Sequence, residues 1–352
     1  MRILLKNVHQ YHVAMTQVAQ IVPFDFFTSK TVLVTGASGL IGSALVDLLS
    51  FGNETGKTDC GIFVAGRNVN LLQQRFPGTE VSCIKYDALE HVNFDFDTDI
   101  IIDCASPAAP CDFMEFPAET ILANVLGVHE LIKYANKCHA AKMVYVSSSE
   151  VYGKIPTPPS GHVENHYGEV DLLCNRSCYP IAKRAAENMC VVYARQNGIN
   201  VSIVRPGHIY GPTASKNDNR VSSSFPVQAA QGSPIVLRSS GDSLRSYTHC
   251  LDCASAILTV AARGGMCEAY NIASKRGVCS IRQMAEVVAA TGNVTLRFAN
   301  PSASDCARFN PMVNSTLDPS KLEALGWRDT MDFKEGFSMT VECLKSLQKG
   351  EQ

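Results

Sequence analysis

The sequence predicts an α/β fold with a doubly wound parallel sheet and a smaller C-terminal α/β region. Short apolar runs of strand length alternate with helical patterns over residues 31–205, as is typical of parallel sheets covered by helices. Two of the runs, 100–102 and 143–146, are continuously apolar, as expected of strands buried on both faces. After Pro206 the alternation ends, and loops rich in Gly, Pro and Ser separate shorter helices.

Each element follows from a local pattern along the chain. Residues 1–29 mix polar and apolar side chains around Pro23, so we expect a short helix and an extended lead-in. The strands of the sheet are expected at 31–35, 61–65, 81–86, 100–104, 143–147 and 200–205. Helices are expected at 40–51, 68–75, 117–138 and 179–197, and later at 224–231, 252–262, 281–291 and 334–347. The Pro- and Gly-rich stretch 153–170 predicts a long loop.

A glycine-rich turn joins the first strand to the first helix. Gly36, Gly39 and Gly42 stand three residues apart, a spacing that differs from the common Gly-x-Gly-x-x-Gly. In such a turn the first glycine permits a tight bend, the second lets the backbone approach a pyrophosphate, and the third lets the helix pack close to the strand. The helix N-terminus adds N–H groups and a positive dipole. Glycines here can also serve packing alone, but the flanking strand and helix favour a nucleotide site.

We expect three parts along the chain. These are a lead-in segment over 1–29, a Rossmann-type dinucleotide-binding domain over 30–205, and a mainly substrate-binding region over 206–352. The length of 352 residues, 46% of them hydrophobic, is enough to bury a substantial core.

Charge, hydropathy and cysteine content narrow the class of protein. The net charge of −2 gives no reason to expect a nucleic-acid or membrane-surface partner. No apolar run approaches the roughly 18 residues of a membrane span, and we expect no signal peptide. The 14 cysteines are expected to be reduced in a cytoplasmic compartment. Cys250 and Cys253 form a Cys-x-x-Cys without a second pair, so no metal site is expected.

A tyrosine and a lysine stand four residues apart near the start of a predicted helix. Tyr179 and Lys183 share one helix face, where the ammonium is expected to favour the phenolate and lower the pKa of the phenol. Such a tyrosine can take a proton from a substrate hydroxyl as hydride leaves the same carbon. The alternative is an ordinary surface pair. The serine run Ser147–Ser149 favours the catalytic interpretation because it follows a strand end, where a hydroxyl can bind the same substrate oxygen. The alternative for this run is a serine-rich turn that caps the strand.

Several segments together resemble a known family, the extended short-chain dehydrogenases/reductases of the NAD-dependent epimerase/dehydratase type. The resemblance runs from about residue 31 to 345 and is greatest to the UDP-glucuronate decarboxylases. The segments that carry it are Cys104–Pro110, Ser148–Gly153, Arg176–Glu187, Asn217–Phe225 and Leu244–Tyr247, with Asn124 in an Asn-x-x-Gly. Fold and site analogy does not by itself fix a substrate.

The resemblance implies chemistry on a nucleotide sugar. A bound nicotinamide cofactor transiently oxidises C4, which eases loss of carbon dioxide from a neighbouring carboxylate-bearing carbon, and the hydride is then returned. The family pattern assigns the redox steps to Ser148, Tyr179 and Lys183. Arg245 would orient the carboxylate, and Glu150 with Ser149 would position it or protonate the enolate. Two alternatives stay open: Arg245 as a diphosphate or surface ion-pair residue, and Glu150 as a residue that orders its loop.

The resemblance also implies binding residues and an assembly. The expected cofactor-binding residues are Gly36, Ser38, Gly39, Leu40, Ile41, Gly42, Arg67, Asp87, Ala105, Ser106, Asn124, Tyr179 and Lys183. The expected substrate-binding residues are Pro107, Arg220, Arg245 and His208. NAD is expected; NADP is an alternative because Gly66 replaces the usual acidic residue and Arg67 follows it. A homodimer is expected through helices 117–138 and 179–197, with Ala182, Ala185, Ala186, Met189 and Val192 as the apolar face.

Other activities remain open at this point. A dTDP-glucose 4,6-dehydratase usually has an Asp-Glu pair, and Ser149 occupies the Asp position here. A nucleotide-sugar 4-epimerase needs no pairing of Glu150 with Arg245. A non-catalytic dinucleotide sensor would commonly lose Tyr179 or Lys183, and this chain keeps both. The loop 153–170 and the stretch around 205–215 differ in detail from the decarboxylases, which bears on the sugar more than on the reaction class.

Overall fold

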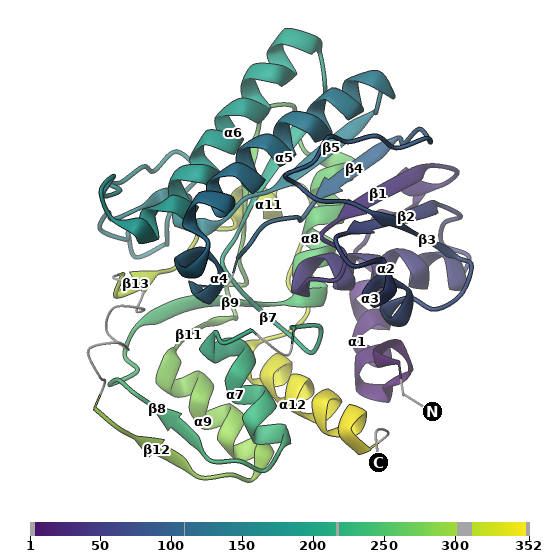
Figure 1. The fold of residues 1–352 in the computed structure, drawn as a ribbon. Helices are drawn as coiled ribbons and strands as arrows, with labels where there is room; N and C mark the ends of the chain where they lie inside the picture. The colour runs from purple at the N-terminus through teal and green to yellow at the C-terminus, as the bar shows by residue number, and fades with distance from the viewer. Residues whose placement is uncertain (1–3, 109, 216–217, 301–311, 350–352) are drawn as a thin grey trace.

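A seven-stranded parallel sheet forms the centre of the molecule (Figure 1). The computed structural model describes residues 4–108, 110–215, 218–300 and 312–349. The strands are β1 (Thr31–Thr35), β2 (Gly61–Gly66), β3 (Val81–Lys85), β4 (Ile100–Asp103), β5 (Lys142–Val146), β6 (Val201–Pro206) and β10 (Ala269–Ile272). Their order is β10-β6-β5-β4-β1-β2-β3. The chain therefore leaves from β1 in both directions, and the prediction of a doubly wound sheet is confirmed.

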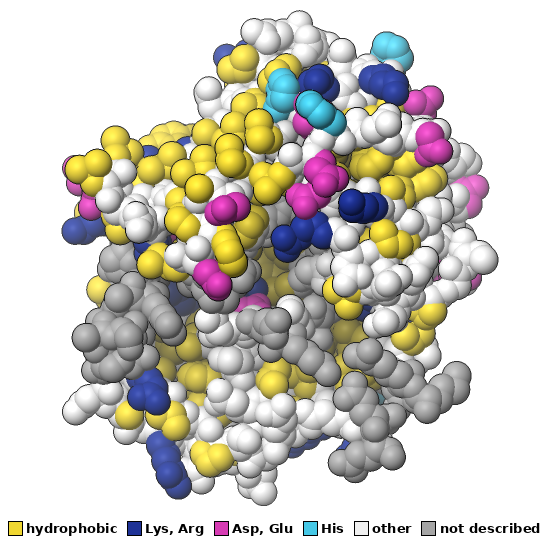
Figure 2. Space-filling model, in the orientation of Figure 1, with side chains coloured by type: hydrophobic (Ala, Val, Ile, Leu, Met, Phe, Trp, Pro, Cys, Tyr) yellow, Lys and Arg dark blue, Asp and Glu magenta, His cyan; other side chains and the backbone are white. Residues whose placement is uncertain are grey.

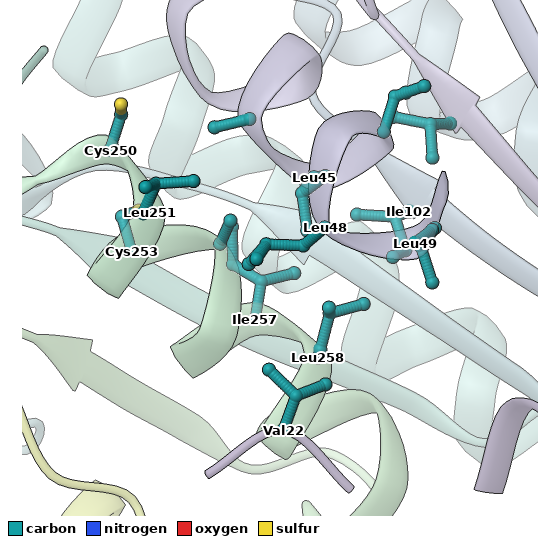
Figure 3. Packing of buried hydrophobic residues seen from close by; sticks show 14 of the residues in the cluster. Val22, Leu45, Leu48, Leu49, Ile102, Cys250, Leu251, Cys253, Ile257 and Leu258 are labelled. Carbon is teal, nitrogen blue, oxygen red and sulfur yellow. The ribbon is translucent and has the colours of Figure 1, made fainter. Parts of the chain in front are cut away.

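Helices cover both faces of this sheet because successive strand residues point to opposite sides. On one face, α2 (Leu40–Glu54) and α8 (Cys250–Arg263) bury Val32 and Val34 of β1. Figure 3 shows Leu48 of α2 beside Ile257 of α8, with Val22 next to Leu258. On the other face, α5 (Pro117–Lys137) and α6 (Cys178–Asn197) bury residues such as Leu33. Both faces of the sheet are thus covered by helices.

Two elements of the predicted substrate-binding region belong to the sheet. Strand β10 pairs in parallel with β6, and α8 packs against α2 across one face. The sequence analysis expected a helix at 252–262 but no strand at 269–272. The strand was missed because its four residues, Ala-Tyr-Asn-Ile, include a polar asparagine and form no continuous apolar run. The part of 206–352 that can bind a substrate is therefore smaller than the range suggests.

The rest of the C-terminal part forms a smaller lobe at the carboxyl edge of the sheet (Figure 1). Its helices are α7 (Val221–Ala230), α9 (Ile281–Gly292) and α12 (Phe333–Lys349), with a short α11 (Ser320–Glu323). Its strands are β7 (His208–Tyr210), β8 (Ile235–Leu237), β9 (Leu244–His249), β11 (Val278–Ser280), β12 (Leu296–Phe298) and β13 (Asn314–Ser315). Strand β9 is the hub, since β7, β11 and β13 all pair with it. These short strands were not predicted.

The remaining helices are short or lie at the N-terminal end. The α3 helix (Val69–Arg75) follows β2, and α4 (Pro110–Glu115) precedes α5. The segment before β1 contains α1 (His9–Val18), which packs against α8 and α12. Tyr11 of α1 donates a hydrogen bond to the buried Asp47 of α2 at 2.9 Å, so this segment is anchored to the sheet body. Within the described residues, every helix is too short or too polar to cross a membrane.

Candidate active site

The glycine turn after β1 is built as the sequence predicts. Gly36 has φ +60°, and a Cβ there would lie 2.6 Å from the carbonyl oxygen of Cys104. A Cβ on Gly42 would lie 2.4 Å from the carbonyl oxygen of Gly36. Both glycines are therefore required by the fold itself, the first by its left-handed conformation and the second by the contact of α2 with the turn.

Gly39 differs from its two neighbours in the turn. It is the N-cap of α2 with φ −81°, and an added Cβ would approach only the Gly36 carbonyl oxygen, at 3.2 Å. The fold thus leaves space at Gly39, in front of the free N–H groups at the start of a helix. This arrangement fits the pyrophosphate of a dinucleotide, which needs close backbone approach and N–H donors.

The other residues predicted to bind the cofactor differ in how far they are exposed to solvent. Ser38 is exposed, Leu40 is buried and Ile41 is half-buried. Arg67 is exposed directly after β2, while Asp87 is half-buried and accepts a hydrogen bond from the backbone of Leu89 at 3.0 Å. Ala105, Ser106 and Pro107 follow β4 at the same sheet edge and are half-buried. Of the segments used in the sequence analysis, Ala109 and Asn217 lie outside the described residues.

Asn124 lies inside the protein, on α5. Its amide donates to the carbonyl oxygen of Thr120 at 2.8 Å and its oxygen accepts from the Tyr145 hydroxyl at 3.3 Å. The side chain is 1% exposed. Asn124 therefore links α5 to β5, beneath the predicted cofactor site.

Ser148, Tyr179 and Lys183 come together at the end of β5. Ser148 follows the strand, is the N-cap of a short helix at Ser149–Tyr152, and its side chain is hydrogen-bonded to Tyr179. Lys183 lies one turn after Tyr179 on α6, is 2% exposed, and donates from Nζ to the Val146 carbonyl oxygen at 2.8 Å. The strand end and the helix thus bring a hydroxyl, a phenol and an ammonium into one cluster.

The pKa of the Tyr179 phenol differs from the sequence-based expectation. Burial raises it to about 12, and the hydrogen bond from Ser148 only partly opposes this rise. Burial also lowers the pKa of Lys183 to about 8. The Lys183 Nζ lies 5.9 Å from the centre of the Tyr179 ring. In the chain alone, desolvation therefore outweighs the attraction between the ammonium and a phenolate.

Glu150 is held by an arginine to which the sequence analysis gave no role. Arg176 donates from Nη1 to Oε2 at 3.0 Å and from Nη2 to Oε1 at 2.8 Å. A bidentate pair of this kind fixes the plane of the carboxylate. Both carboxylate oxygens of Glu150 therefore have a partner within the chain. Ser149 precedes it in the same short helix and is half-buried.

An aromatic ring covers Tyr179 on one side. Phe113 of α4 stacks on the Tyr179 ring with centroids 5.1 Å apart and 12° between the planes. The Arg176 guanidinium lies 5.7 Å from the centre of the Phe113 ring. Phe113 is 1% exposed. No local pattern in the sequence marks this contact, since α4 and α6 are far apart along the chain.

Arg245 is a buried cation on β9. Its side chain is 4% exposed, and Nη1 donates to the carbonyl oxygens of Leu244 at 2.8 Å and Val313 at 3.2 Å. Within the described part of the chain, no Asp or Glu forms an ion pair with it. Burial lowers its pKa from the usual value. A buried guanidinium without a carboxylate partner is costly to the fold and is suited to bind an anion.

Arg220 and His208 lie within electrostatic range of Arg245. Burial lowers the pKa of His208 to about 3, and the charges of Arg245 and Arg220 add to this effect. His208 is therefore neutral at physiological pH, and its buried Nδ1 has no hydrogen-bond partner among the described residues. Arg220 is paired with Asp218, with Nη2 2.5 Å from Oδ2. Its charge also acts on Tyr179, which relates this cluster to the redox residues.

A buried ion pair supports the strand end that carries Ser148. Glu187 of α6 accepts from Ser147 Oγ at 2.6 Å and forms a bidentate pair with Arg205 of β6, at 2.9 and 2.6 Å. Arg205 also lies over the rings of Tyr152 and Tyr167. The sequence analysis quoted Glu187 only as part of a family segment. Its role could not be found locally, because Arg205 is 18 residues away.

The comparison with known proteins decides the family. The sequence pattern of the NAD dependent epimerase/dehydratase family matches residues 32–273 of this chain. The chain belongs to this family. The resemblance found from the sequence is thereby confirmed, and the glycine turn, Ser148, Tyr179 and Lys183 all lie within the matched range.

Individual relatives agree with this assignment. UDP-glucuronic acid decarboxylase 1 of Xenopus tropicalis is 29% identical over 321 residues, covering 90% of this chain and 72% of that protein. The structure resembles UDP-glucose 4-epimerase of Thermotoga maritima with a TM-score of 0.74 at 21% identity, covering 90% of this chain and 99% of that one. It resembles dTDP-glucose 4,6-dehydratase of Streptomyces venezuelae with a TM-score of 0.74 at 21% identity, covering 90% and 97%. The structural likenesses confirm the fold.

Proposed function

We propose that this member of the epimerase/dehydratase family converts UDP-glucuronate to a UDP-pentose with release of carbon dioxide and no net use of cofactor. The observation that carries the proposal is Arg245, a buried guanidinium without a carboxylate partner among the described residues. A decarboxylase substrate brings that carboxylate with it. The relatives named UDP-glucuronic acid decarboxylase support the same reaction.

The glycine turn supports NAD as the cofactor. The open space at Gly39, the start of α2 and the exposed Ser38 can hold a pyrophosphate. Bound NAD would supply the nicotinamide that takes up the C4 hydride and gives it back. The NAD-bound state of a related dehydratase structure favours this dinucleotide. Arg67 stays the residue through which a 2′-phosphate would be recognised.

The redox residues have separate tasks in the proposed reaction. Tyr179 exchanges a proton with the C4 oxygen, and Ser148 holds that oxygen by the hydroxyl that now bonds Tyr179. Lys183, fixed by the Val146 carbonyl, supplies positive charge beneath the phenol. Because the phenol starts with a raised pKa, we infer that it works as a proton donor and acceptor within a short hydrogen-bonded group rather than as a standing phenolate.

The second cluster recognises the charged parts of the substrate. Arg245 binds the carboxylate and stabilises the negative charge that moves onto the sugar as carbon dioxide leaves. Arg220 and the neutral His208 are assigned to the rest of the nucleotide sugar. Glu150, held by Arg176, and Ser149 order the wall next to the reacting carbon and position a water or the substrate there.

Incubation of the enzyme with three substrates separates this proposal from its alternatives. UDP-glucuronate, dTDP-glucose and UDP-glucose are supplied separately with NAD, and the products are identified by mass spectrometry. Carbon dioxide and a UDP-pentose from the first substrate alone are expected. A 4-keto-6-deoxy sugar from dTDP-glucose would indicate a dehydratase, and UDP-galactose from UDP-glucose would indicate a 4-epimerase.

We also propose that the chain forms a homodimer through the outer face of α5 and α6. Ile121, Leu122 and Leu126 on α5 and Val192 on α6 are between 38% and 47% exposed. Figure 2 shows hydrophobic side chains gathered over the part of the molecule where Figure 1 draws α5. A second copy of the same helices would cover this face. Of the alanines expected there, Ala182 and Ala186 are instead buried within the chain.

Charge placed in this face tests the dimer. Leu126→Glu combined with Val192→Glu is expected to shift the sedimentation coefficient from dimer to monomer at micromolar concentration. Val13→Glu is the control, because Val13 is equally exposed on α1. A monomeric wild type, or a variant that remains dimeric, would contradict the proposal.

The cysteines support the proposal that the protein works in a reducing, cytoplasmic compartment. The twelve cysteines whose side chains the structure describes are all free, and several, such as Cys190 and Cys253, are fully buried. In these places cysteine acts as a small apolar side chain.

A further inference from the structure

The loop at 153–170 holds the strand segment that fixes Arg245. Thr157 donates from its hydroxyl to the carbonyl oxygen of Asn314 at 2.7 Å. The backbone of His162 donates to the Thr316 carbonyl at 2.9 Å, and its own carbonyl accepts from Asp318 at 2.9 Å. The loop therefore lies alongside residues 314–318 and is joined to them by one side-chain and two backbone hydrogen bonds.

The same segment supplies an acceptor for Arg245. Arg245 donates to the carbonyl oxygen of Val313, the residue before β13. Strand β13 pairs in parallel with β9, where Ser315 lies opposite Arg245, and the backbone of Leu244 donates to Val313 at 2.9 Å. The orientation of the guanidinium thus depends on where residues 313–315 lie.

Thr157 and His162 form one unit with a defined arrangement of protons. The Thr157 hydroxyl has a single hydrogen, which goes to Asn314, so it accepts from His162 Nε2 at 2.9 Å. His162 is fully buried, stacks on Tyr152 with centroids 5.3 Å apart, and its carbonyl is bonded by Asn271 at 2.8 Å. The imidazole therefore cannot move without disturbing the sheet body.

The backbone also needs this close approach. Gly161 has φ +93°, and a Cβ there would lie 2.6 Å from the carbonyl carbon of Leu317. A residue other than glycine would push the loop away from 314–318. The contact thus depends on the glycine at position 161 and on the Thr157 hydroxyl.

We propose that Thr157 and His162 are positioning residues for Arg245, which they hold in place through the backbone of residues 313–315. The inference rests on the proposed function for the role of Arg245, but the mechanical link is independent of the substrate. Neither residue is assigned to the redox cluster. Tyr152, which His162 stacks on, is also bonded by Arg205, so the same unit connects the support of Ser148 with that of Arg245.

Removal of one hydroxyl tests the link. Thr157→Val in the full chain keeps the shape of the side chain, and Thr157→Ser keeps the hydroxyl as the matched control. Hydrogen exchange at the Leu244 amide is expected to be about tenfold faster in Thr157→Val and unchanged in Thr157→Ser. If Thr157→Val fails to fold, Thr157→Ala removes the same hydroxyl without adding volume. Unchanged exchange would overturn the inference whatever the enzyme does.

Kinetics with UDP-glucuronate test the consequence. We expect Thr157→Val to raise KM about tenfold with a smaller change in kcat, and to leave NAD affinity within about twofold, because only the anion site is displaced. In an Arg245→Leu background the same change should add nothing further. An equal effect with and without Arg245 would overturn the inference.

Failure of the proposed function can be told apart from failure of the positioning role. A wild type that releases no carbon dioxide sinks the proposed reaction, while the exchange at Leu244 still decides the link. An equal loss of affinity for free UDP would assign Arg245 to the diphosphate, and would support the positioning role while rejecting the carboxylate role.

Discussion

At the scale of single residues, the environment of Tyr179 decides how it can act. The pattern Tyr-x-x-x-Lys suggests a phenol made acidic by the neighbouring ammonium. Burial instead raises the pKa of Tyr179 to about 12 and lowers that of Lys183 to about 8. The hydrogen bond with Ser148 partly offsets the first shift. The motif predicts which residues lie together, but the titration of Tyr179 depends on burial, which a local pattern does not contain.

Tyr179→Phe tests the acid–base role. The ring and its stacking on Phe113 are kept while the hydroxyl is lost, so turnover is expected to fall about 10²- to 10⁴-fold with substrate binding largely kept. Tyr134→Phe is the control, because it removes a phenol hydroxyl that bonds the Phe96 carbonyl far from the site. Steady-state kinetics give the answer, and an active Tyr179→Phe enzyme would reject the role.

Partners of charged residues could not be predicted in the same way. Glu150 and Arg245 were found as members of family segments, but the pair Glu150–Arg176 and the acceptor at Val313 depend on contacts across 26 and 68 residues. Arg176 stands in a quoted segment without a role. Such partners are set by tertiary structure, and only the residue types hint at them.

At the scale of elements, the main sheet shows what local sequence patterns can establish. All six predicted strands of the sheet and the helices between them are present, with ends that differ by a few residues. These strands were predictable because helices cover both faces of the sheet, so that the strands are mostly apolar in sequence. The small strands of the second lobe, including β9 and β13, were missed because they lack a continuous apolar run: β9 reads Leu-Arg-Ser-Tyr-Thr-His, and β13 has only two polar residues.

The turn also gives a matched pair of variants. Gly42→Ala is expected to destabilise the protein markedly, because its Cβ would meet the Gly36 carbonyl at 2.4 Å. Gly39→Ala meets the same atom only at 3.2 Å, so the fold should be nearly as stable while NAD affinity falls at least about tenfold. Thermal unfolding and NAD titration measure the two effects. Equal NAD affinity in folded Gly39→Ala would remove the pyrophosphate from this turn.

At the scale of the whole molecule, two structural units contribute to the proposed site. The sheet body supplies the glycine turn, Ser148, Tyr179 and Lys183, and the smaller lobe supplies Arg220, His208 and Arg245. The sequence predicted the first unit well because its chemistry stands at strand ends. For the smaller lobe, the sequence predicted only a residue range, 206–352. That range is too wide, because β10 and α8 belong to the main sheet and its covering layer.

The division of labour between the two units explains the proposed reaction. In the proposed reaction, the redox cluster acts on C4 of the sugar, and Arg245 acts on the carboxylate next to it. Both must hold the same substrate for carbon dioxide to leave and for the hydride to return. The central claim is therefore that one bound sugar is oxidised at C4, loses its carboxylate as carbon dioxide and receives the same hydride back at C4.

A doubly labelled substrate tests this claim most directly. UDP-glucuronate carrying carbon-13 at C6 and deuterium at C4 is turned over by the wild type with unlabelled NAD, and the products are analysed by mass spectrometry. The account predicts that the carbon-13 appears in carbon dioxide and that the deuterium stays on the UDP-pentose. Carbon-13 retained in the sugar, or deuterium lost from it, would contradict the account.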